Sequence, residues 1–452
     1  MSTEDGPDRL LGGPLPKADL LLSNLRLLDP RAGIDRRMDV RVAGGLIAEL
    51  AEAGTLQRTG EEELIEGQGR LLLSPAFFDP HVHLRTPGQE HKEDIESGTR
   101  AAAAGGFGGV IAMPNTDPVL DSAPLLRSVR EAAVKEARVP VGFLPAITRG
   151  LQGEQLTEMA ELRQEGALGF SDDGKPVRSA GMLRKAMQYQ RLCGGVLALH
   201  EEDPTLSRKG SMNEGAVSAA LGIAGIPTVA ESTMVARDAA LAGYEDARVH
   251  FQHLSCAASV EAVAQGKSHR WRISAEVSPH HLLLTDEAVR TMDTRMKMHP
   301  PLTTEADRQA LVEGLRSGVI DCVATDHAPH ARDEKEVPFE QAPMGTTGLE
   351  TSFAALHTGL VIPGIIELGL LIERMTAGAA LFELPTSLIA QGEPANVTLI
   401  DLDAEWVAGE HGWESRSENC CFAGRRLQGR VLLTIAAGGL AHRDRSLAMV
   451  GA

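Results

Sequence analysis

The stretch that decides the fold is Leu71–Arg85, LLLSPAFFDPHVHLR, in which an apolar run leads into two histidines. Such an apolar run is typical of a buried strand. Side chains two apart on a strand point to the same face, so His81 and His83 project together. Two neutral imidazoles on one strand face can chelate a borderline metal such as Zn²⁺. The alternative is two ordinary surface or core histidines. The presence or absence of further potential ligands at the ends of the other predicted strands distinguishes between these interpretations.

The same pattern recurs from residue 70 to residue 330: a short apolar run ends in polar residues, and an Ala/Leu/Glu-rich helical stretch follows. Strands that alternate with helices indicate parallel βαβ units, and eight of them predict an α/β protein with a closed (β/α)8 TIM barrel. A doubly wound open sheet is the alternative, but no GxGxxG opens a helix after the first strand. The predicted strands are 71–84, 109–115, 139–147, 167–173, 195–200, 248–254, 272–278 and 319–327, and the predicted helices include 93–104, 123–137, 156–165, 181–192 and 304–317.

The two ends of the chain differ from this middle part. They contain short β-like pieces separated by glycines and polar turns, and neither end has enough strands for an independent sheet. We therefore expect one small composite β domain from residues 17–69 and 390–452, with the barrel inserted between them as residues 70–389. Residues 1–16, which are rich in Asp, Gly and Pro, are expected to form a flexible leader.

Composition limits the partners of the 452-residue chain. Its formal net charge of −18 argues against nucleic acid or a membrane as a partner, because both require basic surface, although a site for a small anionic substrate can be locally positive. The five cysteines form no CxxC pair and predict neither a disulfide framework nor a cysteine zinc site. No signal peptide or long apolar span is visible, so we expect a cytoplasmic location.

Polar side chains follow the predicted strands at the point where each strand ends. In a barrel these ends meet on one face, where barrel active sites lie. Each residue alone has an ordinary explanation, as a core histidine, a plain turn or a helix cap. Together, four imidazoles and two carboxylates are enough for two divalent metals that share a bridging carboxylate, which is a hydrolytic design. The residues at these ends are His81, His83 and Arg85, then Asn115, then Asp172, Asp173 and Gly174, then His200, then His253, and finally Asp326, His327 and His330.

The remaining histidines are not expected to bind metal. His280 and His281 follow the seventh predicted strand and compete for ligand status, but six ligands are already accounted for, so we expect a structural role for them. Six others have no partner pattern and are predicted to be solvent-facing or packed: His91, His250, His269, His357, His411 and His442.

At this point the residues resemble a known family. The run Asp79–Arg85, continued by Thr86–Glu90, resembles the signature of cyclic amidohydrolases, and more narrowly that of the long-chain dihydroorotases with an aspartate bridge. The resemblance extends from about residue 18 over nearly the whole chain. Further matching pieces are Met113–Thr116, Phe170–Gly174, Pro300–Leu302, Ala324–His330, Ala342–Thr351 and Phe422–Arg425.

The resemblance implies an enzyme of pyrimidine biosynthesis that interconverts N-carbamoyl-L-aspartate and L-dihydroorotate. It implies two Zn²⁺ ions, one held by His81, His83 and Asp326 and the other by His200 and His253. Asp173 would bridge the two ions, a hydroxide between them would attack the ring amide carbonyl, and Asp326 would act as general base and then general acid. A preference for Asp173 over Asp172 rests on the resemblance alone. The residues implied in substrate binding are His83, Arg85, Asn115, His299, His330, Met344 and Gly345.

Three positions depart from the family pattern and concern substrate contacts rather than metal ligands. His299 stands where the family usually has Asn, Thr303 where it has Arg, and Met344 where it has Phe. Because these changes concern substrate contacts, the nearest alternative is another cyclic amidohydrolase, such as an allantoinase or hydantoinase. A hypothesis of a different class is a non-catalytic barrel that serves aspartate transcarbamoylase as a structural partner, which the presence of all six ligands disfavours. For assembly we expect a homodimer, with an association with aspartate transcarbamoylase left open.

Overall fold

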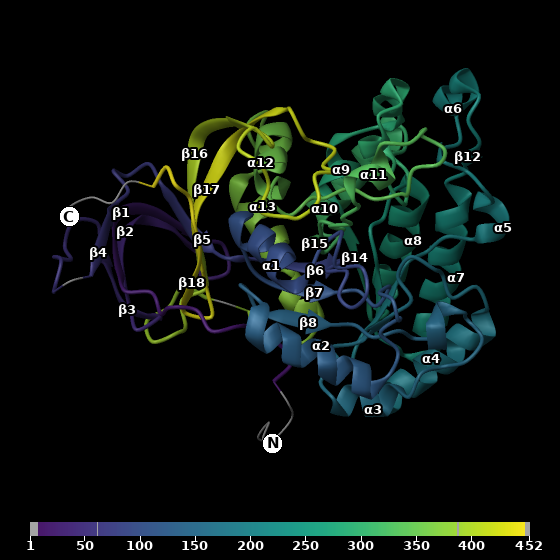
Figure 1. The fold of residues 1–452 in the computed structure, drawn as a ribbon, viewed down its shortest axis with the longest axis horizontal. Helices are drawn as coiled ribbons and strands as arrows, with labels where there is room; N and C mark the ends of the chain where they lie inside the picture. Colours follow the sequence, from purple (N-terminus) through teal and green to yellow (C-terminus); the bar gives the residue numbers. More distant parts are fainter. Residues whose placement is uncertain (1–7, 61, 387, 448–452) are drawn as a thin grey trace.

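The computed structural model describes residues 8–60, 62–386 and 388–447. Two parallel sheets occupy the middle of the chain, one of three strands in the order β6-β7-β8 and one of five in the order β15-β14-β13-β10-β9 (Figure 1). Every strand pair in them is parallel, so the predicted α/β class with parallel sheets is confirmed. The strands are β6 (Phe77–Val82), β7 (Phe107–Ala112), β8 (Val141–Phe143), β9 (Phe170–Ser171), β10 (Leu197–Leu199), β13 (Val249–Phe251), β14 (Ile273–Val277) and β15 (Cys322–Val323).

Backbone hydrogen bonds also connect the two sheets to each other on both sides. Between β8 and β9, the amide of Leu168 donates to the carbonyl of Phe143 at 3.1 Å, and the amide of Ser171 donates to the carbonyl of Pro145 at 3.0 Å. Between the segment after β15 and β6, the amide of His83 donates to the carbonyl of His327 at 2.9 Å. The eight strands therefore contact one another in a continuous order.

Helices connect the strands and cover their outer side. Their ends carry the capping residues that the sequence supplies: Asp94 accepts from the Ser97 amide at the start of α1, and Thr304 accepts from the Asp307 amide at the start of α10. The main helices are α1 (Ile95–Ala104), α2 (Ala123–Glu136), α3 (Met159–Gln164), α4 (Ala180–Cys193), α7 (Val229–Glu245), α8 (Ala257–Ser268), α10 (Glu305–Ser317) and α13 (Leu368–Thr376).

Short elements fill the connections at the rim. They are η1 (Arg149–Leu151), α5 (Pro204–Ser207), β11 (Met212–Asn213), α6 (Ala216–Leu221), β12 (Gly225–Ile226), α9 (Pro279–Leu283), η2 (Asp286–Thr291), η3 (Thr294–Met296), α11 (Arg332–Lys335), α12 (Ser352–Leu356), the π-helix η4 (His357–Val361) and α14 (Gly378–Leu381). Among the described residues no helix is both long and apolar enough to cross a membrane.

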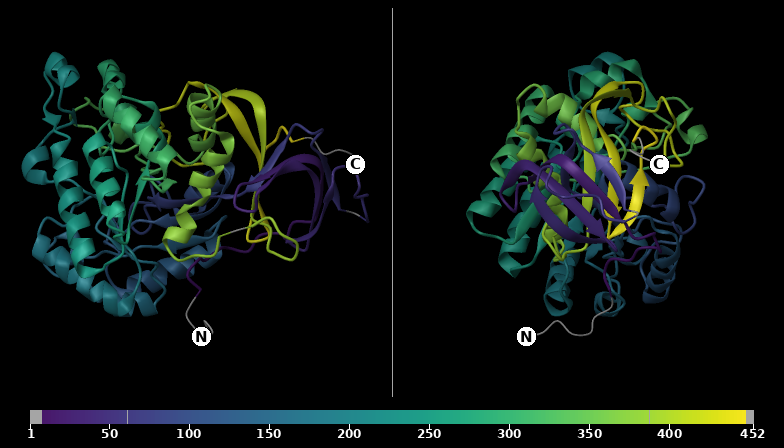
Figure 2. Two further views of the ribbon diagram at one scale, coloured as in Figure 1. Left: turned by 180° about the vertical axis from the view of Figure 1, so that it is seen from behind. Right: turned by 90° about the vertical axis from the view of Figure 1, so that its left-hand side faces the viewer.

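A third large sheet contains strands from both ends of the chain, in the order β18-β17-β16-β5-β1-β2-β3, with β4 paired to β1. Figure 2 shows its purple and yellow strands together at one end of the molecule, beside the parallel sheets. Its strands are β1 (Leu20–Asp29), β2 (Ile34–Ala43), β3 (Leu46–Glu52), β4 (Glu63–Glu66), β5 (Leu72–Pro75), β16 (Val397–Val407), β17 (Arg426–Ala436) and β18 (Gly439–Arg443).

The apolar run that precedes the histidine pair is divided between two sheets. β5 pairs with β1 and β16 in the terminal sheet, whereas β6 begins the parallel strands two residues later. The strand predicted at 71–84 is thus two strands. Of the predicted leader, residues 1–7 lie outside the described residues, while Leu11 exchanges two backbone hydrogen bonds with Val141.

Candidate metal centre

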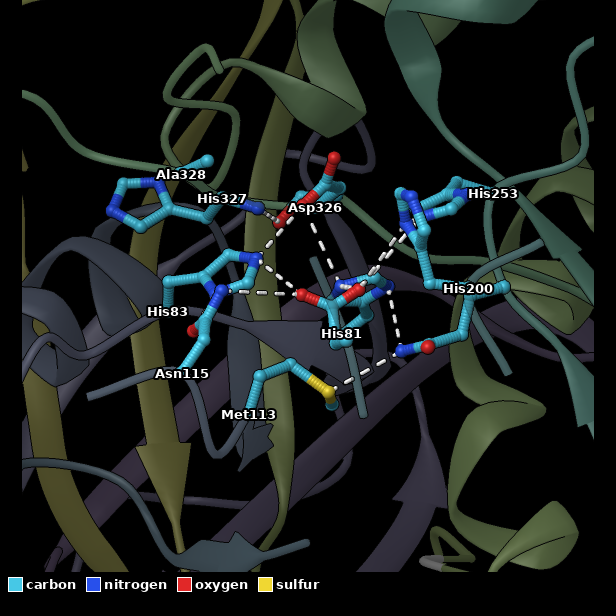
Figure 3. A network of polar contacts seen from close by, with 12 residues as sticks. His81, His83, Met113, Asn115, His200, His253, Asp326, His327 and Ala328 are labelled. Atoms are coloured by element: carbon cyan, nitrogen blue, oxygen red, sulfur yellow. Dashed lines mark hydrogen bonds and ion pairs between the residues drawn. The ribbon is translucent and has the colours of Figure 1, made fainter. Parts of the chain in front are cut away.

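The six predicted metal ligands lie close together at the carboxyl ends of parallel strands, and Figure 3 labels five of them, His81, His83, His200, His253 and Asp326. His81 lies at the end of β6 and His83 just beyond it, while the other four follow β9, β10, β13 and β15 by one to three residues. All six side chains are buried: His81, His83, Asp173, His200, His253 and Asp326. Five of the parallel strands thus each provide one or two of these residues at the same end of the sheets, which is the arrangement expected of parallel strands.

The first group of ligand atoms surrounds the histidine pair. His83 Nε2 lies 3.1 Å from Asp326 Oδ1 and 3.4 Å from Asp173 Oδ2. His81 Nε2 lies 3.4 Å from Asp173 Oδ1 and 3.5 Å from Asp326 Oδ1. Two ligand atoms on one tetrahedral zinc are separated by about 3.4 Å, given bonds of about 2.1 Å. The spacing therefore fits a divalent ion.

The second group lies on the other side of Asp173. His200 Nδ1 and His253 Nε2 are each 3.7 Å from Asp173 Oδ1 and 2.8 Å from each other. Burial lowers the pKa of His200 to about 3, so its ring is neutral at neutral pH, as a metal ligand must be. One carboxylate thus faces both groups of imidazoles.

The two adjacent aspartates point in different directions. Asp172 Oδ1 accepts from the amides of Ile147 and Thr148 at 2.8 and 2.9 Å, and its other oxygen accepts from the Thr148 hydroxyl. Asp173 instead faces the imidazoles. Burial raises the pKa of its carboxyl group, but the rings of His81, His253 and His83 outweigh burial and hold that pKa well below its usual range. Of the two carboxylates, only Asp173 faces both groups of imidazoles, whereas Asp172 holds the loop after β8.

The donor set fits a cation. His81 Nε2 is completely buried, faces two carboxylates and has no hydrogen-bond partner among the described residues. Burial alone would lower the pKa of His81, but Glu276, Asp173 and Asp326 outweigh it and raise the pKa well above its usual value. Imidazole nitrogens with carboxylate oxygens are a ligand set that suits zinc. A divalent ion would satisfy the same negative field in place of the proton.

Three site residues have backbone angles that non-glycine residues rarely adopt. Arg85, His253 and Asp326 have φ of +58°, +31° and +47°. Such conformations cost free energy and persist where the surrounding structure fixes them, which is common at functional sites. They turn each side chain from the end of its strand toward the common centre.

Sequence reasoning missed a second set of polar residues beneath the ligands. Glu276 Oε1 lies 2.6 Å from His81 Nδ1, and Glu276 Oε2 lies 2.9 Å from His250 Nε2. Burial raises the pKa of Glu276, but the His81 and His250 rings outweigh it and lower the pKa to about 2. Gln252 Nε2 also lies 3.3 Å from His81 Nδ1. The available signal was the alternation Ser274, Glu276 within a run that otherwise predicts a buried barrel strand.

The predicted substrate residues lie around the same opening. Arg85 is buried and its Nε donates to the Pro329 carbonyl at 3.1 Å. His330 Nε2 lies 2.9 Å from the Met344 carbonyl oxygen, and burial together with the Arg85 guanidinium lowers the pKa of His330 to about 3. Gly345, at φ +138°, passes so close to His330 that a Cβ would lie 2.9 Å from its Nε2.

Asn115 is engaged with the ligands themselves. Its Oδ1 lies 2.8 Å from His83 Nδ1, and its Nδ2 lies 3.5 Å from Asp173 Oδ2. The contact fixes His83 with Nε2 directed toward the two aspartates. The structure thus gives Asn115 a contact that the prediction of carboxylate binding did not include.

The residues that depart from the family pattern separate into two kinds. His299 Nε2 pairs with Glu202, and its ring lies 4.6 Å from that of His200, so it borders the second ligand group. Thr303 is buried and its hydroxyl donates to the Ser255 carbonyl at 2.6 Å, which makes it a structural residue.

The two histidines that follow β14 lie among structural contacts. His281 Nδ1 lies 2.7 Å from Ser278 Oγ, and its Nε2 lies 3.1 Å from the Pro300 carbonyl oxygen. His280 is buried beside it.

Solved structures named hydantoinase or dihydropyrimidinase are similar to this chain in fold. The fold is similar to that of L-hydantoinase (dihydropyrimidinase) from Arthrobacter aurescens, with a TM-score of 0.82 and 24% identity over 94% of this chain and 96% of that one. It is also similar to dihydropyrimidinase from Brevibacillus agri, with a TM-score of 0.81 and 21% identity over 94% and 95% of the two chains. The likeness to these two structures shows the fold.

Sequence comparison shows the family to which the chain belongs. The profile of the family described as dihydro-orotase-like matches residues 69–261. A dihydroorotase of Syntrophotalea carbinolica is 43% identical over 425 residues, covering 94% of this chain and 99% of that protein. A dihydroorotase of Pelotomaculum thermopropionicum is 42% identical over 427 residues, with the same coverage of both. The chain belongs to the dihydroorotase family.

Proposed function

We propose that this chain is a dihydroorotase, which interconverts N-carbamoyl-L-aspartate and L-dihydroorotate in pyrimidine biosynthesis. The observation that carries the proposal is identity of 42–43% over almost the full length of relatives named dihydroorotase. The complete set of six buried ligands supports it and disfavours a non-catalytic barrel.

We propose Zn²⁺ as the metal, at two ions per chain. His81, His83 and Asp326 would hold one ion, His200 and His253 the other, with Asp173 between them. When bound, such ions lower the pKa of water and polarise a carbonyl. Nitrogen-rich ligand sets of this kind support zinc over magnesium or calcium.

The proton steps of the reaction fall to Asp326. Its carboxylate lies at the opening beside His83 and would take the proton released when water adds to the ring carbonyl. The carbon–nitrogen bond of the ring then breaks, and Asp326 would return that proton to the departing nitrogen. The reverse sequence closes the ring, so one group serves as base and acid.

Arg85 would bind the carboxylate of the substrate. Its Nε is engaged with Pro329, and its two Nη groups form no hydrogen bond with the described residues. Two parallel N–H groups suit a carboxylate, which they bind bidentately. His330 and the loop of Met344 and Gly345 lie beside it, and His299 would contact the ring from the side of His200.

Turnover of dihydroorotate by purified, zinc-loaded protein, followed by ultraviolet absorbance with and without a chelator, tests the proposal. We expect chelator-sensitive ring opening, and Arg85→Ala should reduce kcat/KM for dihydroorotate by about 100-fold, the loss of one charged bidentate contact. Absence of ring opening and closure would refute a dihydroorotase. Hydrolysis of a hydantoin that lacks the carboxylate, unaffected by Arg85→Ala, would assign another cyclic amidohydrolase.

We also propose that the two parallel sheets form one closed (β/α)8 barrel. The hydrogen bonds from Leu168 and Ser171 at one junction, and from His83 at the other, support closure. Pairing of strands from both ends in one sheet supports a composite β domain of residues 17–69 and 390–452 around a barrel of 70–389. The cytoplasmic location, the homodimer and the association with aspartate transcarbamoylase stay predictions.

A further inference from the structure

A buried polar chain runs from the ligand His81 into the interior beneath the metal centre. It passes from His81 Nδ1 to Glu276 Oε1 at 2.6 Å, from Glu276 Oε2 to His250 Nε2 at 2.9 Å, and from His250 Nδ1 to Ser274 Oγ at 2.8 Å. The side chains of His81, His250 and Glu276 are at most 1% exposed. The interiors of (β/α)8 barrels are usually filled by bulky apolar residues, so the presence of this row of buried polar side chains requires an explanation.

Strand pairing builds the chain. His250 on β13 lies directly opposite Ser274 on β14, and Glu276 lies two residues further along the same face of β14. The amide of His253 also donates to Glu276 Oε1, at 3.2 Å. Glu276 is therefore held by two strands and can occupy only one position relative to His81.

The consequence for His81 concerns which of its nitrogens carries the proton. Its Nε2 faces the oxygens of Asp173 and Asp326, and these alone would favour a proton on Nε2, where it would exclude a metal ion. A carboxylate at 2.6 Å from Nδ1 keeps a proton on that atom, so the proton that a metal ion displaces is the one on Nε2, whose lone pair is then directed at the centre. Fixing of the tautomer by an outer carboxylate raises the metal affinity of a histidine.

We propose that Glu276 is a positioning residue that sets the tautomer of His81, and that His250 and Ser274 hold Glu276 in place for this task. The inference rests on the proposed function only for the assignment of His81 as a ligand. Zn²⁺ affinity is measured without substrate. A protein that binds Zn²⁺ but does not open dihydroorotate would therefore refute the proposed function and leave this inference standing.

Direct binding of a third ion is the competing interpretation, because Glu276, His250 and Cys322 have ligand atoms close together. Two observations oppose it. The two oxygens of Glu276 are already engaged with histidines, and burial raises the pKa of the Cys322 thiol well above its usual value, so it stays protonated. A protonated thiol is not the ligand form.

The test is Glu276→Gln, with Zn²⁺ affinity measured by competition with a chromophoric chelator. The amide has the same shape but can donate to His81 Nδ1, which moves the proton to Nε2. We expect Zn²⁺ affinity to fall by about 10- to 100-fold at one site. The absorption bands of the Co²⁺-loaded protein should shift as well, which a purely structural change would not cause.

Glu93→Gln is the matched control. Glu93 is also fully buried and lies 3.2 Å from a histidine nitrogen, that of His327, which is not a proposed ligand. We expect Glu93→Gln to reduce stability but keep Zn²⁺ affinity. Equal loss of affinity in both variants, or unchanged affinity in Glu276→Gln, would overturn the proposal. A Glu276→Gln protein that binds one Zn²⁺ ion fewer than wild type, with unchanged affinity at its remaining sites, would show that Glu276 is itself a ligand and would also overturn the proposal.

His250→Phe gives a second measurement should Glu276→Gln fail to fold. It removes the partner of Glu276 Oε2 and leaves His81 and its contact in place. We expect a fall in Zn²⁺ affinity of about 10-fold, at the lower end of the range for outer residues. Unchanged affinity in a folded His250→Phe protein would refute the role of the chain beyond Glu276.

Discussion

Two adjacent carboxylates, Asp172 and Asp173, should respond in opposite ways to the same substitution. Asp173 faces four imidazole nitrogens at 3.4 to 3.7 Å, whereas Asp172 accepts three hydrogen bonds from Ile147 and Thr148. Asp173→Asn should therefore remove metal, and Asp172→Asn should not. Comparison of these two variants, at adjacent positions, tests whether Asp173 is the bridging residue.

The magnitudes follow from these contacts. An outer residue of a metal site contributes about 10- to 100-fold in affinity, so loss of a charged group that faces both ligand groups should cost at least about 100-fold, or about 3 kcal/mol. In Asp172→Asn the amide oxygen still accepts from both backbone amides, so we expect about 1 kcal/mol of lost stability. Asp172→Ala leaves three buried donors without an acceptor and should cost about 4 kcal/mol.

Metal content after equilibration with a chelator, and urea unfolding of the metal-free proteins, measure the two effects separately. Asp173→Asn should lose zinc while its metal-free form unfolds normally. Asp172→Asn should keep zinc affinity within about threefold of wild type, a change below 1 kcal/mol. Zinc loss in Asp172→Asn equal to that in Asp173→Asn would show that the orientation of the two carboxylates does not decide metal binding.

Three further predictions concern stability. Burial lowers the pKa of Lys335 to about 7, so its amine binds a proton more readily in the unfolded chain than in the folded one. Stability should therefore rise from pH 7 to 10 by at most about 1.4 kcal/mol per pH unit, and urea titrations of Lys335→Met should show a flatter rise. Gly105→Ala would place a Cβ 2.1 Å from the Leu349 carbonyl oxygen and should cost about 2 kcal/mol by the same method, whereas Gly369→Ala, with open space around it, should cost nothing. Removal of zinc should lower the free energy of unfolding by about 3 kcal/mol at an ion concentration 100 times Kd, measured by thermal unfolding with and without chelator.

Strand existence and strand-end chemistry could be predicted because they depend on local pattern. Each of the eight predicted runs contains a parallel strand, and polar residues after a buried strand necessarily lie at its carboxyl end. The division of Leu71–Leu84 could not be predicted, because the apolar residues Leu71–Leu73 and Phe77–Phe78 on the two sides give no sign that they belong to different sheets. The pairing of β5 with β1 and β16, while β6 pairs with β7, reveals it.

The outer residues of the site escaped prediction for a different reason. Glu276 and His250 lie inside apolar runs, where a polar residue reads as an interruption rather than as part of a site. Their role depends on the pairing of His250 with Ser274 between two strands and on the contact of Glu276 with His81 from a third strand. Similarly, hydrogen bonds from the amides of Ile147 and Thr148 direct Asp172 away from the imidazoles. The sequence pattern around Asp172 does not predict this contact, because the two amides belong to the preceding loop.

The pairing of β5 with β16 has a consequence for biosynthesis. Pro75 on β5 pairs with Val397 on β16, a separation of 322 residues. At about 5 to 20 residues per second, a ribosome needs roughly 15 to 60 s to make the intervening chain. Throughout that time the apolar edge at Leu72 and Leu73 lacks its partner strand, and an unpaired edge invites pairing with other chains. The nascent protein therefore has a period in which chaperone binding at β5 competes with aggregation, and it ends when β16 emerges.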